Sequence, residues 1–249
     1  MFRTQCSAPW PACLALAIPL LLGGGAASGA EGWSGSLAVT TDYIERGVSQ
    51  SDGDPALQGS IAFWHPTGWY AGAWASNGDT PRRYYASSGT HAELNLFAGY
   101  TLRPESDWVL DAHAVRYLYP NDPAPVSYNY NELTLSAAWR GRLYASLSVS
   151  PDTTVYSQAG WARNRTATTL ELSMQQPLSR WLTLIAGVGR HDVATTPNVG
   201  YYYGSASLAL QLRRITLEVG EYVTSGEARR LFGSRLAGTR TVGTVSVSF

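Results

Sequence analysis

The stretch AELNLFAGYTL, residues 92–102, alternates between two kinds of side chain along its whole length. Every second residue from Leu94 to Leu102 is apolar, and Glu93, Asn95, Gly99 and Thr101 stand among the residues between them. Successive side chains of a β-strand point to opposite faces, so this pattern predicts a strand with one apolar face.

The same alternation recurs along most of the chain after residue 33. It predicts strands at 33–43, 56–65, 68–77, 91–102, 107–118, 130–139, 142–150, 165–176, 181–191, 201–212, 214–224 and 239–249. Most of these segments have about 9 to 12 residues, which is the length that a tilted strand needs to cross a bilayer.

The connections between these strands alternate in length. Tight turns are expected at 65–68, 103–106, 140–141, 177–180 and 213–214, and longer loops at 44–55, 78–90, 119–129, 151–164, 192–200 and 225–238. Short turns at one end and long loops at the other are typical of bacterial outer-membrane barrels. We therefore predict an all-β fold, a transmembrane antiparallel up-and-down β-barrel of about 12 strands that comprises residues 31–249.

Soluble β-proteins alternate too, so further features must identify the surroundings. The less apolar face carries mainly Ser, Thr, Gly, Glu and Gln, which suits a wet interior better than a packed core. Aromatic residues stand near predicted strand ends, where interfacial girdles lie: Trp69, Tyr100, Trp108, Trp139 and Trp181. The last predicted strand alternates up to Phe249, as in the signal that the outer-membrane barrel assembly machinery reads.

The first 30 residues have the order of a secretory signal peptide. Arg3 precedes an apolar run at 12–22, and small residues follow up to Ala30, after which we expect cleavage. The alternative is a buried N-terminal helix. Cys6 and Cys13 both lie in this segment, so the mature chain would have no disulfide, thiolate metal site or cysteine nucleophile. The predicted location is the bacterial outer membrane, with both termini on the periplasmic, short-turn side.

The composition agrees with this prediction and gives no support for nucleic acid as a partner. Charged residues make up 14% of the chain and aromatic residues 12%, and the formal net charge is zero. A chain without excess positive charge gives no electrostatic reason to expect nucleic acid as a partner.

Three segments near the start carry a family resemblance. They read TDYIERGVSQS at 41–51, DPALQG at 54–59 and GWYAGAWASN at 68–77. This series resembles the proteobacterial TorF family, which is labelled as porins by inference, and similar pieces follow at 93–101, 117–120 and 128–133. The resemblance implies an outer-membrane barrel and, less directly, transport. Ile44 and Glu45 stand where that family is expected to have a basic and an aromatic residue.

Six titratable residues share the face that would point into the barrel. A charge at mid-depth on the lipid face costs about 2–4 kcal/mol, so these side chains should line the interior. They either form a polar pore or bridge to arginines in a filled interior, and the sequence leaves both open. The candidates are Glu93, Asp111, His113, Glu132, Glu171 and Glu218.

The first long loop is a candidate constriction. Its charged residues are Asp42, Arg46, Asp52 and Asp54, and we expect Arg46 to pair with an acidic neighbour and to fold the loop inward. An ion site is the alternative, although only Asp52-Gly53-Asp54 resembles the spacing of a calcium loop.

Catalysis has one candidate pair, Asp111 and His113, two positions apart on one strand face. A serine hydrolase also needs a nucleophile beside the histidine, and no serine is marked for that role. We predict no catalytic residue, no cofactor and no metal.

The sequence thus favours a porin-like channel for the passive diffusion of small polar solutes or ions. Its expected partners are outer-membrane lipid, lipopolysaccharide and the barrel assembly machinery. Two alternatives remain, an outer-membrane hydrolase and a non-conducting structural or adhesive barrel that acts through its long loops.

Overall fold

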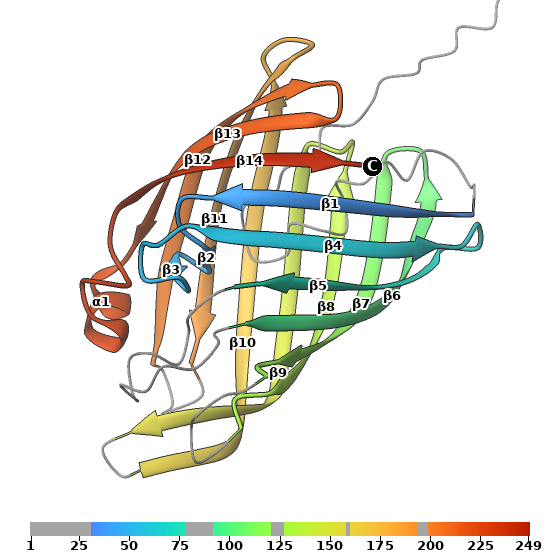
Figure 1. Cartoon of the computed structure of the whole chain (residues 1–249). Coiled ribbons are helices and arrows are strands. Elements are labelled where there is room, and N and C mark those ends of the chain that lie inside the picture. The colour runs from blue at the N-terminus through green and yellow to red at the C-terminus, as the bar shows by residue number, and fades with distance from the viewer. Residues whose placement is uncertain (1–30, 78–91, 121–126, 158–159, 194–198) are drawn as a thin grey trace, which may run out of the picture.

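A computed structural model describes residues 31–77, 92–120, 127–157, 160–193 and 199–249, with 155–164 as backbone only. Twelve antiparallel strands close into one barrel (Figure 1). They are β1 (Gly32–Thr40), β4 (Ala56–Trp64), β5 (Trp69–Ser76), β6 (Glu93–Glu105), β7 (Trp108–Leu118), β8 (Tyr130–Trp139), β9 (Leu143–Ser157), β10 (Gly160–Pro177), β11 (Leu182–Asp192), β12 (Gly200–Leu212), β13 (Ile215–Thr224) and β14 (Arg240–Ser248). The predicted fold class is confirmed, and the predicted signal peptide lies outside the described residues.

Each strand of the barrel pairs with its neighbour in the sequence, except at the closure. There β1 pairs with β14, with Leu37 opposite Val247. At the same place the backbones of Gly35 and Phe249 exchange two hydrogen bonds, of 2.9 and 3.0 Å. The sheet therefore has no free edge.

The apolar face of each strand lies outside. In β8, Leu133 and Leu135 are each 54% exposed, whereas Thr134 between them is 2% exposed. The same alternation holds along β13, where Leu217 and Val219 are exposed and Glu218 is buried. An apolar exterior over a polar interior is the arrangement of a barrel surrounded by lipid.

The predicted loop at 151–164 is wrong, because most of it belongs to β9 and β10. Beyond Ser150, β9 has only β10 as a partner, and the two strands continue together with register shifts on either side of Arg165. Figure 1 shows this hairpin reaching past its neighbours. Pro151 and the polar residues after it resemble a loop, because a strand outside the bilayer needs no apolar face.

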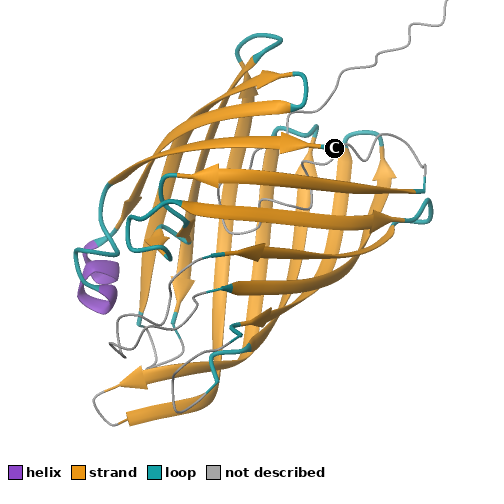
Figure 2. Ribbon diagram, in the orientation of Figure 1, coloured by secondary structure: helices purple, strands orange, loops and turns teal. Residues whose placement is uncertain are grey.

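Two other predicted loops contain short elements. The first long loop holds the strands β2 (Ile44–Glu45) and β3 (Val48–Ser49), which pair only with each other. The last long loop holds α1 (Gly226–Phe232), the helix drawn purple at the long-loop end in Figure 2. Within the described residues, no helix is long and apolar enough to cross a membrane.

The predicted girdle residues lie at the short-turn end. Trp69 begins β5, Trp108 begins β7 and Trp139 ends β8. The Trp69 ring lies 4.9 Å from that of Tyr100, and the guanidinium of Arg140 lies 4.7 Å from the centre of the Trp139 ring. Aromatic rings beside arginines suit the boundary between hydrocarbon and headgroups.

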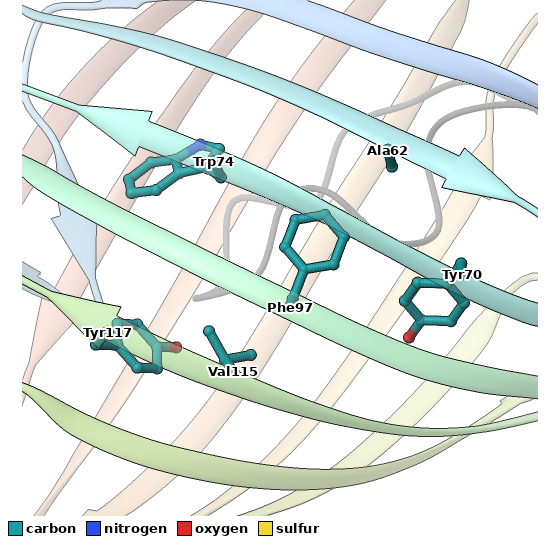
Figure 3. Packing of buried hydrophobic residues seen from close by; sticks show 6 residues of the cluster. All are labelled: Ala62, Tyr70, Trp74, Phe97, Val115 and Tyr117. Carbon is teal, nitrogen blue, oxygen red and sulfur yellow. The ribbon is translucent and has the colours of Figure 1, made fainter.

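Aromatic side chains cover part of the inner wall. Figure 3 shows a buried cluster from β4 to β7, formed by Ala62, Tyr70, Trp74, Phe97, Val115 and Tyr117. Tyr43 from the first loop packs on this cluster, with its ring 5.5 Å from that of Trp74. The cluster supports the loop from one side.

Candidate functional site

The first long loop, residues 42–55, packs against inward-facing side chains of the barrel wall. Its strands β2 and β3 are joined by Arg46 and Gly47, whose φ angles are 49° and 76°. Two central residues with positive φ make the two-residue turn that a tight hairpin needs. A Cβ on Gly47 would lie 2.7 Å from both Thr224 and Tyr203, so only glycine fits. This turn places Arg46 at the tip of the hairpin.

Arg46 reaches a carboxylate on the opposite wall. Its Nη2 donates to Oε1 of Glu132 at 2.7 Å and to Oε2 at 2.6 Å, and both side chains are buried. Ser150 on β9 also donates to Oε2, at 2.6 Å. Charge-assisted hydrogen bonds of this length are strong when water is excluded. The loop is therefore fixed at its tip to β8.

The base of the loop is fixed through Asp42. Its Oδ1 accepts hydrogen bonds from Ser49 at 2.5 Å and from Ser51 at 2.9 Å. Its Oδ2 lies 2.8 Å from Nη1 of Arg240, the first residue of β14. These contacts give a structural role to the aspartate and the two serines of the segment TDYIERGVSQS.

The first loop also joins the last one, residues 225–239. The backbone N–H of Ser49 donates to Leu236 at 2.9 Å, and Val48 bridges to Ala237. Asp52 pairs with Arg235 at 2.6 Å. Val48, Ala237, Ala228 of α1 and two tyrosines of β12 form one buried apolar cluster. The two loops thus pack together at the long-loop end.

The backbone of Asp54 forms a hydrogen bond within the first loop. Its backbone N–H donates to the carbonyl of Ser51 at 3.0 Å, which closes the turn that contains Asp52 and Gly53. Among the described residues, no group of three His, Cys, Asp or Glu side chains could hold a metal ion.

Glu45 precedes Arg46 and is close enough to carboxylates of the barrel wall to be affected by their charge. Burial raises its pKa, the Arg46 guanidinium lowers it, and the carboxylates of Glu132 and Glu171 raise it further, so the pKa stays above its ordinary value. Because Glu132 belongs to β8 and Glu171 to β10, charges from two separate strands of the wall act on Glu45 at the loop tip.

Asp111 and His113 form a close pair on β7. Nδ1 of His113 lies 2.7 Å from Oδ1 of Asp111. The same carboxylate accepts hydrogen bonds from Tyr70 and Thr101, both at 2.9 Å to Oδ2. Nε2 of His113 is buried and has no hydrogen-bond partner among the described residues. The pair thus has an oriented imidazole but no hydroxyl nucleophile placed on it within that part of the chain.

The other three candidates are carboxylates without a charged hydrogen-bond donor in the described contacts. Glu93 accepts from Asn95 at 2.7 Å and from Tyr43 at 3.3 Å. Glu171 accepts from Tyr203 at 2.5 Å and from Ser146 at 3.3 Å. Oε1 of Glu218 is buried without a hydrogen-bond partner.

The sequence reasoning did not single out several residues that complete the site. Ser150 supports Glu132, and Arg235 and Arg240 hold the first loop. Arg240 could have been found, because it lies on the inward face of a predicted strand. Arg235 gives no such signal, since it lies in a loop without periodicity.

Comparison with known proteins gives one family. The model of a family described as "Bacterial protein of unknown function (Gcw_chp)" matches residues 24–243. No curated protein sequence matches the chain. The finer resemblance to TorF stays a prediction.

Solved porin structures share the fold. The NanC porin is 9% identical with a TM-score of 0.58, and the match covers 88% of this chain and 99% of NanC. The KdgM porin is 11% identical with a TM-score of 0.54, over 87% and 99% of the two chains. A second KdgM structure, in complex with disordered oligogalacturonate, is 10% identical with a TM-score of 0.55. This match covers 88% of the present chain and 99% of KdgM. At this identity the likeness concerns the fold alone.

Proposed function

We propose that this chain, which belongs to the bacterial family Gcw_chp, is a passive outer-membrane channel for small polar solutes or ions. The observation that carries the proposal is the inward-folded first loop, which Arg46 fixes to Glu132 across the barrel. A loop held inside a closed barrel narrows the path and gives it a defined lining.

The polar inner face supports the same function. Hydroxyl and carboxyl groups line the interior of β8, β9, β10 and β13, while leucines and valines cover the outside. A barrel of twelve strands has a narrower interior than porins of 16 to 18 strands, so the solutes should be small.

The two unlike ends of the barrel support a proposed orientation. We place the short turns and both chain termini in the periplasm, and the long loops with α1 on the outside, beside lipopolysaccharide. The aromatic residues and arginines at the short-turn end would then lie at the inner leaflet of the outer membrane.

The acidic interior of this barrel does not favour the ligand that one structural neighbour binds. KdgM has been solved with oligogalacturonate, a chain of acidic sugars. The interior of the present barrel carries Glu171 and Glu218 without a basic partner in any described contact, so a polyanion would be repelled.

Planar-bilayer recording and liposome swelling with the refolded protein test the proposal. We expect stepwise conductance and the uptake of small sugars, with a cut-off below that of the large porins. Absence of conductance at every voltage, together with absence of swelling, would contradict a channel and favour a structural or adhesive barrel. Deletion of loop residues in cells would then be the test for adhesion.

The hydrolase alternative has its own test. If the pair of Asp111 and His113 were catalytic, the refolded protein would cleave ester or lipid substrates, and His113→Ala would abolish this activity. We expect no hydrolysis above background for the wild type or the variant, because no hydroxyl of the described residues forms a hydrogen bond with Nε2 of His113.

A further inference from the structure

We infer that the interior passes cations in preference to anions, an inference that rests on the proposed channel function. It comes from the balance of charges that face inward. Seven described carboxylates lie on the inner face of the strands or in residues 42–45 of the first loop: Asp42, Glu45, Glu93, Asp111, Glu132, Glu171 and Glu218. The basic side chains described there are Arg46, Arg240, His113 and His191.

The basic side chains are already committed to partners. Arg46 binds Glu132, Arg240 binds Asp42, and His113 contacts Asp111. His191 lies 2.8 Å from the hydroxyl of Thr169. Each of the four basic side chains is thus in contact with a described group, whereas Glu171 and Glu218 have no basic partner in any described contact.

One of the excess carboxylates, Glu171, binds only neutral groups in the contacts that the structure describes. It accepts hydrogen bonds from the phenol of Tyr203 and from the hydroxyl of Ser146. Such donors hold a carboxylate in place without cancelling its charge. Glu171 stands on β10 and Glu218 on β13, so the negative charge belongs to more than one strand of the wall.

Glu218 is a second inward carboxylate without a basic partner in any described contact. The residue is 7% exposed, and its Oε1 has no hydrogen-bond partner among the described residues. Leu217 and Val219 on either side point outward, so Glu218 points inward. Its cross-strand neighbours are Ala209 and Thr244, which carry no charge. Because no basic side chain neutralises it in a described contact, this carboxylate adds to the negative field of the interior.

The physical consequence is selectivity. Carboxylates inside a channel with low-dielectric walls raise the local concentration of cations and repel anions. We expect the K⁺ permeability to exceed the Cl⁻ permeability by roughly tenfold at low ionic strength, and the ratio to fall as salt screens the carboxylates.

The test is the reversal potential of the refolded full-length barrel under a KCl gradient. Glu171→Gln and Glu218→Gln should each lower the K⁺/Cl⁻ ratio, and the double variant should lower it further. Glu221→Gln is the matched control, because Glu221 is exposed on the outward face of the same strand as Glu218. Glu218→Asp keeps the charge and should keep the selectivity.

The outcomes separate the two proposals. Conductance with equal or anion-favouring permeability would overturn the inference and leave the channel intact. Cation preference that neither glutamine variant changes would overturn the role of Glu171 and Glu218. Absence of conductance would overturn both proposals. Gel mobility of the heated and unheated variants shows whether each barrel has folded.

Discussion

Arg46 and Glu132 are 86 residues apart in the sequence, and Nη2 of Arg46 lies within 2.7 Å of both carboxylate oxygens of Glu132. Arg46 stands at the tip of the first loop, and Glu132 stands on β8. This contact joins the tip of the loop to the far wall of the barrel, while Asp42 and its contact with Arg240 fix the base of the loop.

Arg46→Ala should loosen the first loop and raise the conductance. The variant leaves Glu132 buried without its cation, and breaking a buried pair costs about 3–5 kcal/mol. Single-channel recording should show larger and noisier currents, and urea titration in detergent should show a less stable fold. An unchanged conductance would contradict the view that this loop narrows the path.

Arg235→Ala is the matched control for that experiment. Arg235 pairs with Asp52 of the same loop at 2.6 Å, but its side chain is 81% exposed. An exposed pair contributes about 0–1 kcal/mol, so this variant should change stability and conductance little.

Gly47→Ala should destabilise the loop more than Gly53→Ala. Both glycines have positive φ, 76° and 84°, which costs an alanine about 1–2 kcal/mol. Only at Gly47 would the new Cβ also meet Thr224 and Tyr203 at 2.7 Å, whereas at Gly53 the nearest atom is 3.5 Å away. Overpacking adds about 1–3 kcal/mol. Equal losses in urea unfolding would show that the loop tip does not pack as described.

Leu135→Arg should destabilise the barrel in lipid much more than Leu102→Arg. Both leucines are exposed on the outer face, but Leu135 lies mid-strand in β8, and Leu102 lies near the short-turn end of β6. An outward arginine costs about 2–4 kcal/mol at the midplane and about 0–1 kcal/mol near the interface. Reversible unfolding from vesicles measures both values. Equal costs would place the bilayer elsewhere on the barrel.

Phe249→Ala should reduce assembly in cells without reducing the stability of the refolded protein. The Phe249 side chain is 62% exposed, and its backbone bonds to Gly35 do not require the ring. Truncating an exposed side chain changes stability by about 0.5 kcal/mol or less. The amount of protein in outer-membrane fractions should fall, relative to Val247→Ala as control. Normal amounts would contradict recognition of this residue by the assembly machinery.

The strands could be read from the sequence because lipid outside and water inside impose a period of two. All twelve predicted segments overlap the observed strands, and the ends of β8 were predicted at Tyr130 and Trp139 as observed. This alternation of apolar and polar residues ends outside the bilayer. There β9 and β10 continue through Pro151 and polar residues, because their pairing with each other needs no apolar face.

The contacts of the site could be read only in part. Alternation placed Glu132 inward, and Arg46 was expected to pair with an acidic residue and to fold the first loop inward. Nothing local could show which carboxylate Arg46 would meet, because this depends on how the loop crosses the closed barrel. The seven residues of α1 were missed because they are too few to display a helical period.

The closure of the barrel also sets an order of events during assembly. The eleven other strand pairings join sequence neighbours and can form as successive hairpins. The pairing of Leu37 with Val247 must wait until the last strand arrives, and until then β1 and β14 are open edges that could recruit another chain. The seam between them is therefore both the last junction to form and the natural place where a helper protein would hold the unfinished sheet.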